Sequence, residues 1–164
     1  MQRLLKHLWT GRWQLRRCFS DAVLARIEAG VKACEQRHAG EIRVAVEAAL
    51  PLDALLQRRS ARERALDVFS QLRVWDTEHN NGVLIYVLLA DRDVEIVADR
   101  GVAGGRVAAS EWEACCRVIE AHFRDGHYAD GMIAGVEAVA AVLARHPPDA
   151  ADVGNELPDA PALL

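Results

Sequence analysis

An uninterrupted apolar run of eight residues, 83–90, follows the turn-forming residues Asn80, Asn81 and Gly82. The run contains three β-branched residues and a tyrosine, and it is bounded by turn residues on both sides. This pattern is typical of a strand that is covered on both faces, as in the middle of a sheet. We therefore expect residues 83–90 to form the centre of the fold.

Two further segments have the pattern of strands. Residues 41–50 alternate apolar and polar positions until Pro51, which predicts a strand with one wetter face. Residues 91–93 form a polar turn that leads the chain back into residues 94–98. The last two apolar segments are therefore expected to pair as a hairpin.

Four other segments space their apolar residues three and four apart, as in a helix. They span residues 21–38, 61–72, 110–125 and 128–146. Ser60 with Glu63 and Ser110 with Glu113 each have the form of a capping box. Gly131 and Gly135 are expected where the last helix closely approaches the sheet, and residues 99–109 are expected to form a loop.

This order of elements predicts an α/β fold. A helical crossover between the first two strands makes them parallel, and the hairpin adds an antiparallel strand. We expect a three-layer α/β/α sandwich with a small mixed sheet, formed by residues 20–146. Residues 147–164 are acidic, aperiodic and contain prolines, so the sequence predicts a disordered tail there.

Residues 1–19 differ in charge from the rest of the chain. They contain five basic residues and no acid, with leucines and tryptophans between them. Trp9 and Trp13 are four residues apart, on one face of a helix that Gly11 would interrupt. This basic amphipathic segment is expected either to lie on an anionic membrane surface or to pack on the domain or on a second copy.

Composition limits the classes of function. With 164 residues, 51% of them hydrophobic and 27% charged, the chain is expected to be one soluble globular domain. Its net charge of −4 gives no reason to expect a nucleic-acid partner. The four cysteines lack a metal or disulfide spacing, and no apolar run approaches the length of a signal peptide core or a membrane span, which favours the cytoplasm.

The predicted sheet gathers polar residues at both of its ends. One set comprises Glu41, His79, Asn80, Asn81, Asp99, Arg100 and Gly101; the other comprises Leu50, Asp91, Arg92 and Asp93. The general rule for parallel strands favours the second set, but a hairpin turn explains it adequately. In the first set, oxygen atoms suit a hard cation such as calcium, and Arg100 suits phosphate. Ordinary turn chemistry also explains this set.

Several segments, in this order, resemble the TPM domain family. They are residues 40–44, 64–72, 79–87, 91–92, 123–126 and 135–136. The resemblance spans about residues 20–145. It implies an α/β/α sandwich and an association with divalent cations, especially calcium. One member of the family is a thylakoid lumen protein with acid phosphatase activity.

The resemblance also implies roles for particular residues. The family usually has Asp-Asn-Gly where this chain has Asn80, Asn81 and Gly82, so one negative charge is missing. An asparagine offers a metal one oxygen without that charge, which weakens divalent binding. Glu41, Asn81 and Asp99 remain candidate metal ligands, and Asp99 and Glu41 would be the catalytic residues of a phosphatase.

The expectation that follows is a ligand-binding or accessory domain whose partner is a small ligand or a protein. Its ligand surface would comprise Asn80, Asn81, Gly82, Asp99, Arg100 and Gly101. A weak, divalent-metal-assisted acid phosphatase is the first alternative. Contact of residues 1–19 with a membrane surface or a second copy is the second.

Overall fold

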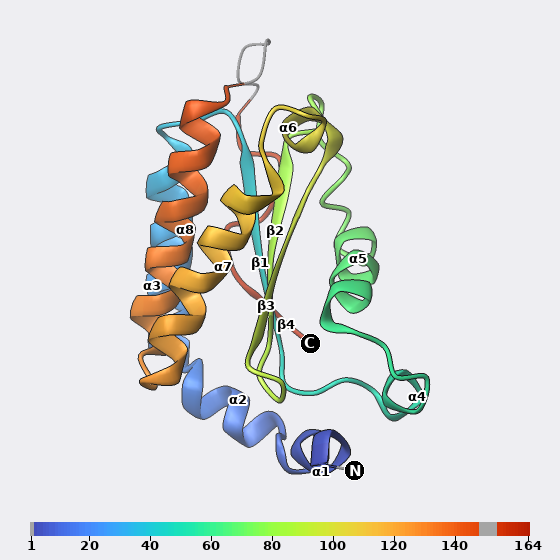
Figure 1. The fold of residues 1–164 in the computed structure, drawn as a ribbon. Helices are drawn as coiled ribbons and strands as arrows, with labels where there is room; N and C mark the ends of the chain where they lie inside the picture. The colour runs from blue at the N-terminus through green and yellow to red at the C-terminus, as the bar shows by residue number, and fades with distance from the viewer. Residues whose placement is uncertain (1, 148–153) are drawn as a thin grey trace.

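The structure, a computed structural model, describes residues 2–147 and 154–164 and contains one mixed sheet (Figure 1). Its strands are β1 (Glu41–Glu47), β2 (Gly82–Leu88), β3 (Asp93–Ala98) and β4 (Ala162–Leu163), in the order β3-β2-β1-β4. β1 and β2 are parallel, and β2 and β3 form an antiparallel hairpin, as the sequence predicts. β4 is a fourth strand that the sequence did not predict.

The helices cover both faces of the sheet. They are α1 (Gln2–Trp9), α2 (Arg12–Cys18), α3 (Asp21–Glu35), α4 (Leu52–Leu56), α5 (Ala61–Gln71), α6 (Arg100–Ala103), α7 (Ala109–Arg124) and α8 (Tyr128–Arg145). Figure 1 shows α3, α7 and α8 on one face of the sheet and α5 on the other. The predicted α/β class and its three layers are confirmed.

Strand β2 joins the two layers of the core because all seven of its residues are buried. Val83, Ile85 and Val87 pack in the cluster that contains the apolar faces of α3, α7 and α8. The alternate side chains, including Leu84 and Tyr86, pack in the cluster formed with α4 and α5. Coverage on both faces explains why the sequence of β2 has no polar alternation.

Of the two N-terminal capping boxes predicted from the sequence, one forms and the other does not. Ser60 and Glu63 form the predicted capping box at the start of α5, with Ser60 Oγ accepting the Glu63 N–H at 3.1 Å. The same prediction is wrong for Ser110, because the N-cap of α7 lies two residues earlier, at Ala108. A short helix, α6, also lies within the expected loop 99–109.

Gly131 and Gly135 are needed for contact between helices rather than contact with the sheet. A Cβ atom on Gly131 would lie 2.7 Å from His122 Cβ, and one on Gly135 would lie 2.3 Å from Ile119 Cγ1. Both neighbours belong to α7. The two glycines therefore set the close packing of α8 on α7, which corrects the expectation that they face the sheet.

Residues 154–164 differ from the expected disordered tail, because they run along β1 and supply β4. Glu41 accepts the N–H groups of Glu156 and Leu157, at 3.2 and 3.0 Å. Arg43 donates to the carbonyl oxygens of Pro158, at 2.7 Å, and of Ala160. Leu157 is buried in the α5-side core. Residues 148–153 of the expected tail lie outside the described residues.

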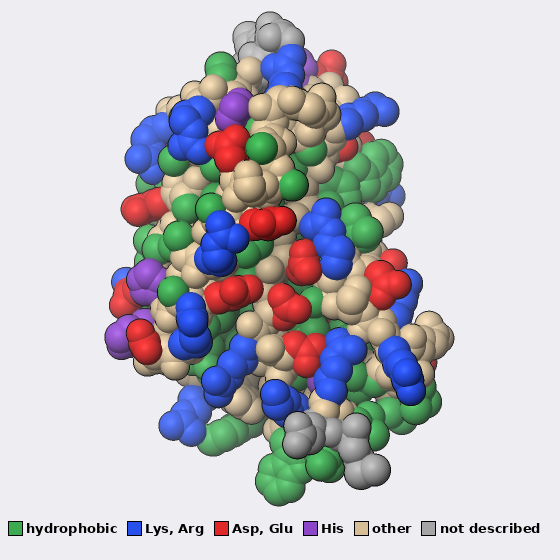
Figure 2. All heavy atoms as spheres, viewed as in Figure 1, with side chains coloured by type: hydrophobic (Ala, Val, Ile, Leu, Met, Phe, Trp, Pro, Cys, Tyr) green, Lys and Arg blue, Asp and Glu red, His purple; other side chains and the backbone are tan. Residues whose placement is uncertain are grey.

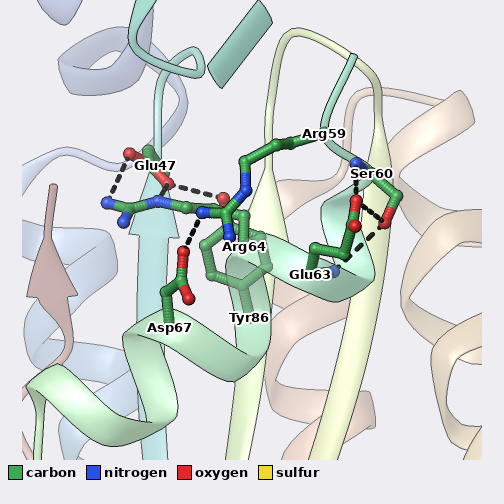
Figure 3. A network of polar contacts seen from close by, with 7 residues as sticks. All are labelled: Glu47, Arg59, Ser60, Glu63, Arg64, Asp67 and Tyr86. Atoms are coloured by element: carbon green, nitrogen blue, oxygen red, sulfur yellow. Dashed lines mark hydrogen bonds and ion pairs between the residues drawn. The ribbon is translucent and has the colours of Figure 1, made fainter. Parts of the chain in front are cut away.

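A buried polar network closes the α5 side of the sheet (Figure 3). Arg64 on α5 donates twice to the Glu47 carboxylate, each time at 2.9 Å, and the Tyr86 hydroxyl donates to Glu47 at 2.6 Å. The Glu47 side chain is only 5% exposed, and Tyr86 is fully buried. Burial, followed by the hydrogen bond to Glu47, raises the pKa of Tyr86, so its hydroxyl remains a donor.

Replacing Arg64 by alanine is expected to lower the free energy of unfolding by about 3–5 kcal/mol, because it leaves the buried Glu47 carboxylate without an ion pair. Replacing Tyr86 by phenylalanine removes one hydrogen bond to the same carboxylate and should cost about 1–3 kcal/mol. Urea unfolding followed by circular dichroism measures both values.

Arg59→Ala is the matched control, because Arg59 forms an ion pair with Asp67 at a site where each side chain is 36% exposed. An exposed pair contributes at most about 1 kcal/mol. A loss for Arg64→Ala no larger than the loss for Arg59→Ala would contradict the role assigned to the buried network.

Candidate functional site

The residues predicted to form a ligand surface meet at one end of the sheet. The turn before β2 and the residues after β3 are joined by backbone hydrogen bonds, from Asp99 N–H to Gly82 O at 2.9 Å and from Gly101 N–H to Asn80 O at 2.8 Å. Glu41, the first residue of β1, donates its N–H to Asn81 O at 3.2 Å. Three segments that are distant in sequence therefore form one polar site.

The turn that carries Asn80 and Asn81 is fixed by local contacts. Asn80 has a φ of +52°, in the left-handed region that asparagine tolerates better than most residues. Thr77 Oγ1 accepts the Asn81 N–H at 3.1 Å, and the Asn81 side-chain amide donates to Ala39 O. Thr77 was not among the predicted residues, since a threonine four positions before a turn has no distinctive signal.

Gly82 and Gly101 allow the segments of the site to approach each other. A Cβ atom on Gly82 would lie 2.0 Å from Val74 O, and one on Gly101 would lie 2.3 Å from His79 O. Neither position tolerates a side chain without a shift of the backbone. These glycines thus have a structural reason to be present, and their contact with a ligand stays a prediction.

Asp99 and Arg100 bring opposite charges to the same edge. Asp99 Oδ1 accepts the backbone N–H of Arg100 at 2.7 Å, which caps the short helix α6. Arg100 Nε donates to Asn80 Oδ1 at 3.1 Å, and the Arg100 side chain is exposed. The Asn80 side-chain oxygen is thus occupied by the Arg100 guanidinium group.

Two oxygen atoms of the site are buried without a hydrogen-bond donor among the described residues. They are Asn81 Oδ1 and Asp99 Oδ2. Asn81 is only 3% exposed. A buried acceptor without a donor costs about 1–3 kcal/mol, so such atoms are uncommon and need an explanation. A bound cation or a ligand that donates hydrogen bonds would satisfy either of them.

Glu41 is already engaged in holding the C-terminal segment. It is 4% exposed, and its Oε2 atom accepts the backbone N–H groups of Glu156 and Leu157. These donors lie more than a hundred residues away in sequence, so no local pattern could reveal them. The role of Glu41 as a metal ligand or general base stays a prediction, in competition with this structural role.

A cavity of about 250 Å³ opens beside Glu41, lined in part by Lys32, Glu35 and His38. Glu35 accepts the Ile42 N–H at 2.9 Å. Burial, together with the nearby Glu41 and Asp159 carboxylates, raises the pKa of Glu35 to about 8. A carboxyl group that keeps its proton near neutral pH is typical of functional sites, and also of packed carboxylate clusters. Sequence alone did not single out Glu35.

The second predicted set lies at the opposite end of the sheet and anchors α1. Asp91 accepts hydrogen bonds from Arg3 Nε at 2.9 Å and lies 3.1 Å from His7 Nε2. Burial acts in the opposite direction, but Arg3 and His7 together hold the pKa of Asp91 below its usual value. His7 Nδ1 also accepts the Leu50 N–H at 2.9 Å, while Arg92 occupies the hairpin turn with a φ of +55°.

Two other features are absent from residues 2–147 and 154–164. No group of three or more histidine, cysteine, aspartate or glutamate side chains is placed to hold a metal ion. None of the helices in this part of the chain is both long and apolar enough to cross a membrane.

The fold and the polar end of its sheet define an α/β/α sandwich with a candidate ligand site at the turn before β2. The family model of the TPM domain matches residues 15–142, so the chain belongs to the TPM domain family. This confirms the resemblance noted from the sequence. No curated protein sequence matches the chain.

Solved structures include two similar proteins. The BA42 protein of the psychrophilic bacterium Bizionia argentinensis is 28% identical, with a TM-score of 0.75 over 88% of this chain and 94% of that one. The N-terminal domain of a P. gingivalis protein is 27% identical, with a TM-score of 0.58 over 80% of this chain and 82% of that one.

The raised pKa of Glu35 predicts a pH dependence of stability. The folded protein holds this proton up to about pH 8, whereas the group has an ordinary value of 4.5. The stabilisation that protonated Glu35 contributes is therefore fully present below about pH 4.5. It decreases as the pH rises to about 8 and is constant above that pH. Glu35→Gln should remove about 1–2 kcal/mol of that fall.

The measurement is urea unfolding of both proteins between pH 5 and pH 9, with a chelator present throughout. Glu28→Gln is the control, because Glu28 is an exposed carboxylate on the same helix, and its slope should match that of the unmodified protein. Parallel pH curves for Glu35→Gln and the unmodified protein would refute the prediction.

Proposed function

We propose that this TPM domain is a ligand-binding or accessory domain whose ligand surface is the end of the sheet formed by residues 80–82 and 99–101. The observation that carries the proposal is the pair of buried oxygen atoms, Asn81 Oδ1 and Asp99 Oδ2, that lack a donor among the described residues. The convergence of three chain segments at this end supports it.

A divalent cation such as calcium fits the site only in part. Calcium takes about six to eight oxygen ligands, and the two orphaned oxygens carry a single negative charge between them. Arg100 adds a positive charge beside Asn80, which opposes cation binding. We therefore propose weak calcium binding, with a dissociation constant of about 10⁻⁴ M or higher.

Asn80→Asp is expected to strengthen calcium binding roughly tenfold, because it adds a formal charge at the position where the family usually has an acid. Asp99→Asn should weaken binding by a similar factor, because it removes the charge that the site already has. Isothermal titration of calcium into chelator-treated protein measures both changes.

Asp76→Asn is the control, because Asp76 is an exposed carboxylate on the loop before the site. Its substitution should leave calcium binding unchanged. Equal losses for Asp76→Asn and Asp99→Asn would show that calcium binds through general surface charge, which contradicts the proposed site.

A weak, metal-assisted phosphomonoester hydrolase is the second candidate. It is favoured by the exposed Arg100 beside Asp99, since a guanidinium group can bind phosphate while a carboxylate acts on the metal or the attacking water. The engagement of Glu41 with the C-terminal segment leaves Asp99 as the principal catalytic candidate.

If this candidate is correct, the protein hydrolyses a generic phosphomonoester faster with calcium or magnesium than with a chelator. Asp99→Ala should remove at least about 90% of the metal-dependent rate, in line with the loss of a general base or metal ligand. A rate that is unaffected by metal, or by Asp99→Ala, would exclude the hydrolase and leave the binding proposal intact.

Two further proposals concern the setting of the domain. We propose a cytoplasmic location, which the four free thiols support. Burial first, and then nearby carboxylates, raise the pKa of Cys116 to about 12, so this thiol stays protonated and unreactive. We also propose that residues 1–19 contact a membrane surface or a second copy.

A further inference from the structure

The end of the molecule opposite the candidate ligand site exposes several large apolar side chains. α1 and α2 carry four of them, including Trp9, which is 85% exposed, and Trp13, which is 74% exposed. Leu5 and Leu8 are the others on these helices, and Leu52 and Leu56 of α4 are exposed at the same end (Figure 1). An apolar patch of this kind is typical of an interaction surface.

The contacts of α1 with the domain determine which of its side chains face outward. Arg3 and His7, four residues apart on one side of the helix, both contact Asp91 of the hairpin. Leu5, Leu8 and Trp9 lie on the other side and are exposed. The apolar face is thus held outward by a buried anchor, since His7 is only 4% exposed.

The same surface is basic. Residues 2–19 contain no acid, and the acid that α1 contacts, Asp91, is matched by Arg3 and His7. The side chains of Arg12 and Arg16 have no hydrogen-bond or ion-pair partner among the described residues. Arg17 lies 5.6 Å from the Trp13 ring centre. Figure 2 shows basic and hydrophobic side chains together at this end.

Hollows flank α2 on two sides. One, of about 390 Å³, is lined by Arg12 and Arg16 together with apolar residues that include Leu15, Ala48 and Leu163. The other, of about 540 Å³, is lined in part by Trp13, Arg17 and Tyr128. The first combines two guanidinium groups with an apolar wall, which matches a phosphate group attached to an apolar body.

We infer that the α1–α2 surface, defined by Leu5, Leu8, Trp9, Arg12, Trp13 and Arg16, docks on a bilayer that contains anionic phospholipid. Trp9, Trp13 and the leucines enter the interface between headgroups and acyl chains, where tryptophan is favoured. Arg12 and Arg16 hold headgroup phosphates. This inference deepens the proposal for residues 1–19 and does not depend on the ligand site at the other end of the sheet.

Charge selects the bilayer over a second copy of the chain. Two copies related by a two-fold axis would place the same basic surfaces against each other, and like charges at an interface oppose association. An anionic leaflet supplies the opposite charge, and each basic residue near it strengthens binding by about fivefold.

The experiment is sedimentation of the full chain with two kinds of vesicle, one of phosphatidylcholine alone and one of phosphatidylcholine mixed with phosphatidylglycerol. Binding is expected to the mixed vesicles, to weaken as salt is raised, and to be at least about tenfold weaker on phosphatidylcholine alone. Quenching of tryptophan fluorescence by brominated lipid should show that Trp9 and Trp13 enter the bilayer.

Two double variants separate the apolar and electrostatic contributions. Trp9→Ser with Trp13→Ser, and Arg12→Gln with Arg16→Gln, should each weaken binding to the mixed vesicles roughly tenfold or more. All four side chains are exposed, so circular dichroism should report an unchanged fold. Quenching by brominated lipid should also disappear in the tryptophan variant.

Matched controls use the same residue types elsewhere on the surface. Trp75 is 48% exposed and lies outside the α1–α2 surface, so Trp75→Ser should bind as the unmodified protein does. Arg73→Gln with Arg117→Gln removes the same net charge as the arginine variant, from two exposed positions. This variant should also leave binding unchanged.

The inference is overturned if the mixed vesicles fail to bind the protein, or if the controls weaken binding as much as the α1–α2 variants do. Light scattering without lipid tests for a second copy. If the protein is a dimer and the variant with Trp9→Ser and Trp13→Ser is a monomer, the surface binds a second copy of the chain. Calcium titration of the same variants tests whether the two surfaces act independently, because variants that lose lipid binding should bind calcium unchanged.

Discussion

The burial of β2 on both faces is the constraint on which the rest of the structure depends. The six side chains after Gly82 alternate between the two core clusters, so helices must cover both sides of the sheet. The turn before β2 then places Asn80 and Asn81 at one end of the sheet. The hairpin after it places Asp91 at the other, where α1 is anchored. Both candidate surfaces thus depend on the position of this strand.

A polar side chain that points into the core of a sheet covered on both faces loses its contact with water, which costs free energy. Glu47 is such a residue, and the protein offsets its burial with two donors from Arg64 and one from the Tyr86 hydroxyl. The edge of β1 that does not pair with β2 also carries polar backbone groups, and these are covered in another way. Residues 154–164 cover part of it, held by Glu41 and Arg43 through contacts with backbone groups. Both solutions satisfy polar groups that the fold removes from water.

The sequence revealed those features that depend on neighbouring residues or on the order of elements. Examples are the buried central strand, observed as Gly82–Leu88 instead of 83–90, the capping box at Ser60, and the parallel pairing of β1 with β2. The gathering of Asn80, Asp99 and Arg100 also followed from strand order. Features that depend on distant contacts were missed. The raised pKa of Glu35 comes from burial and from the Glu41 and Asp159 carboxylates, the second of which is far from Glu35 in sequence. Residues 154–164 have no strand pattern because β4 is only two residues long.

The two surfaces are separated by the length of β2, which is about 20 Å for seven residues. Charges so far apart interact weakly in salt, because the Debye length is about 8 Å at physiological ionic strength. The acidic and amide oxygens at one end and the basic apolar surface at the other therefore act independently. A domain docked through α1 and α2 would hold its ligand site on the side away from the bilayer. That geometry would be compatible with the proposed accessory role, in which the domain would present one partner close to a membrane while binding another.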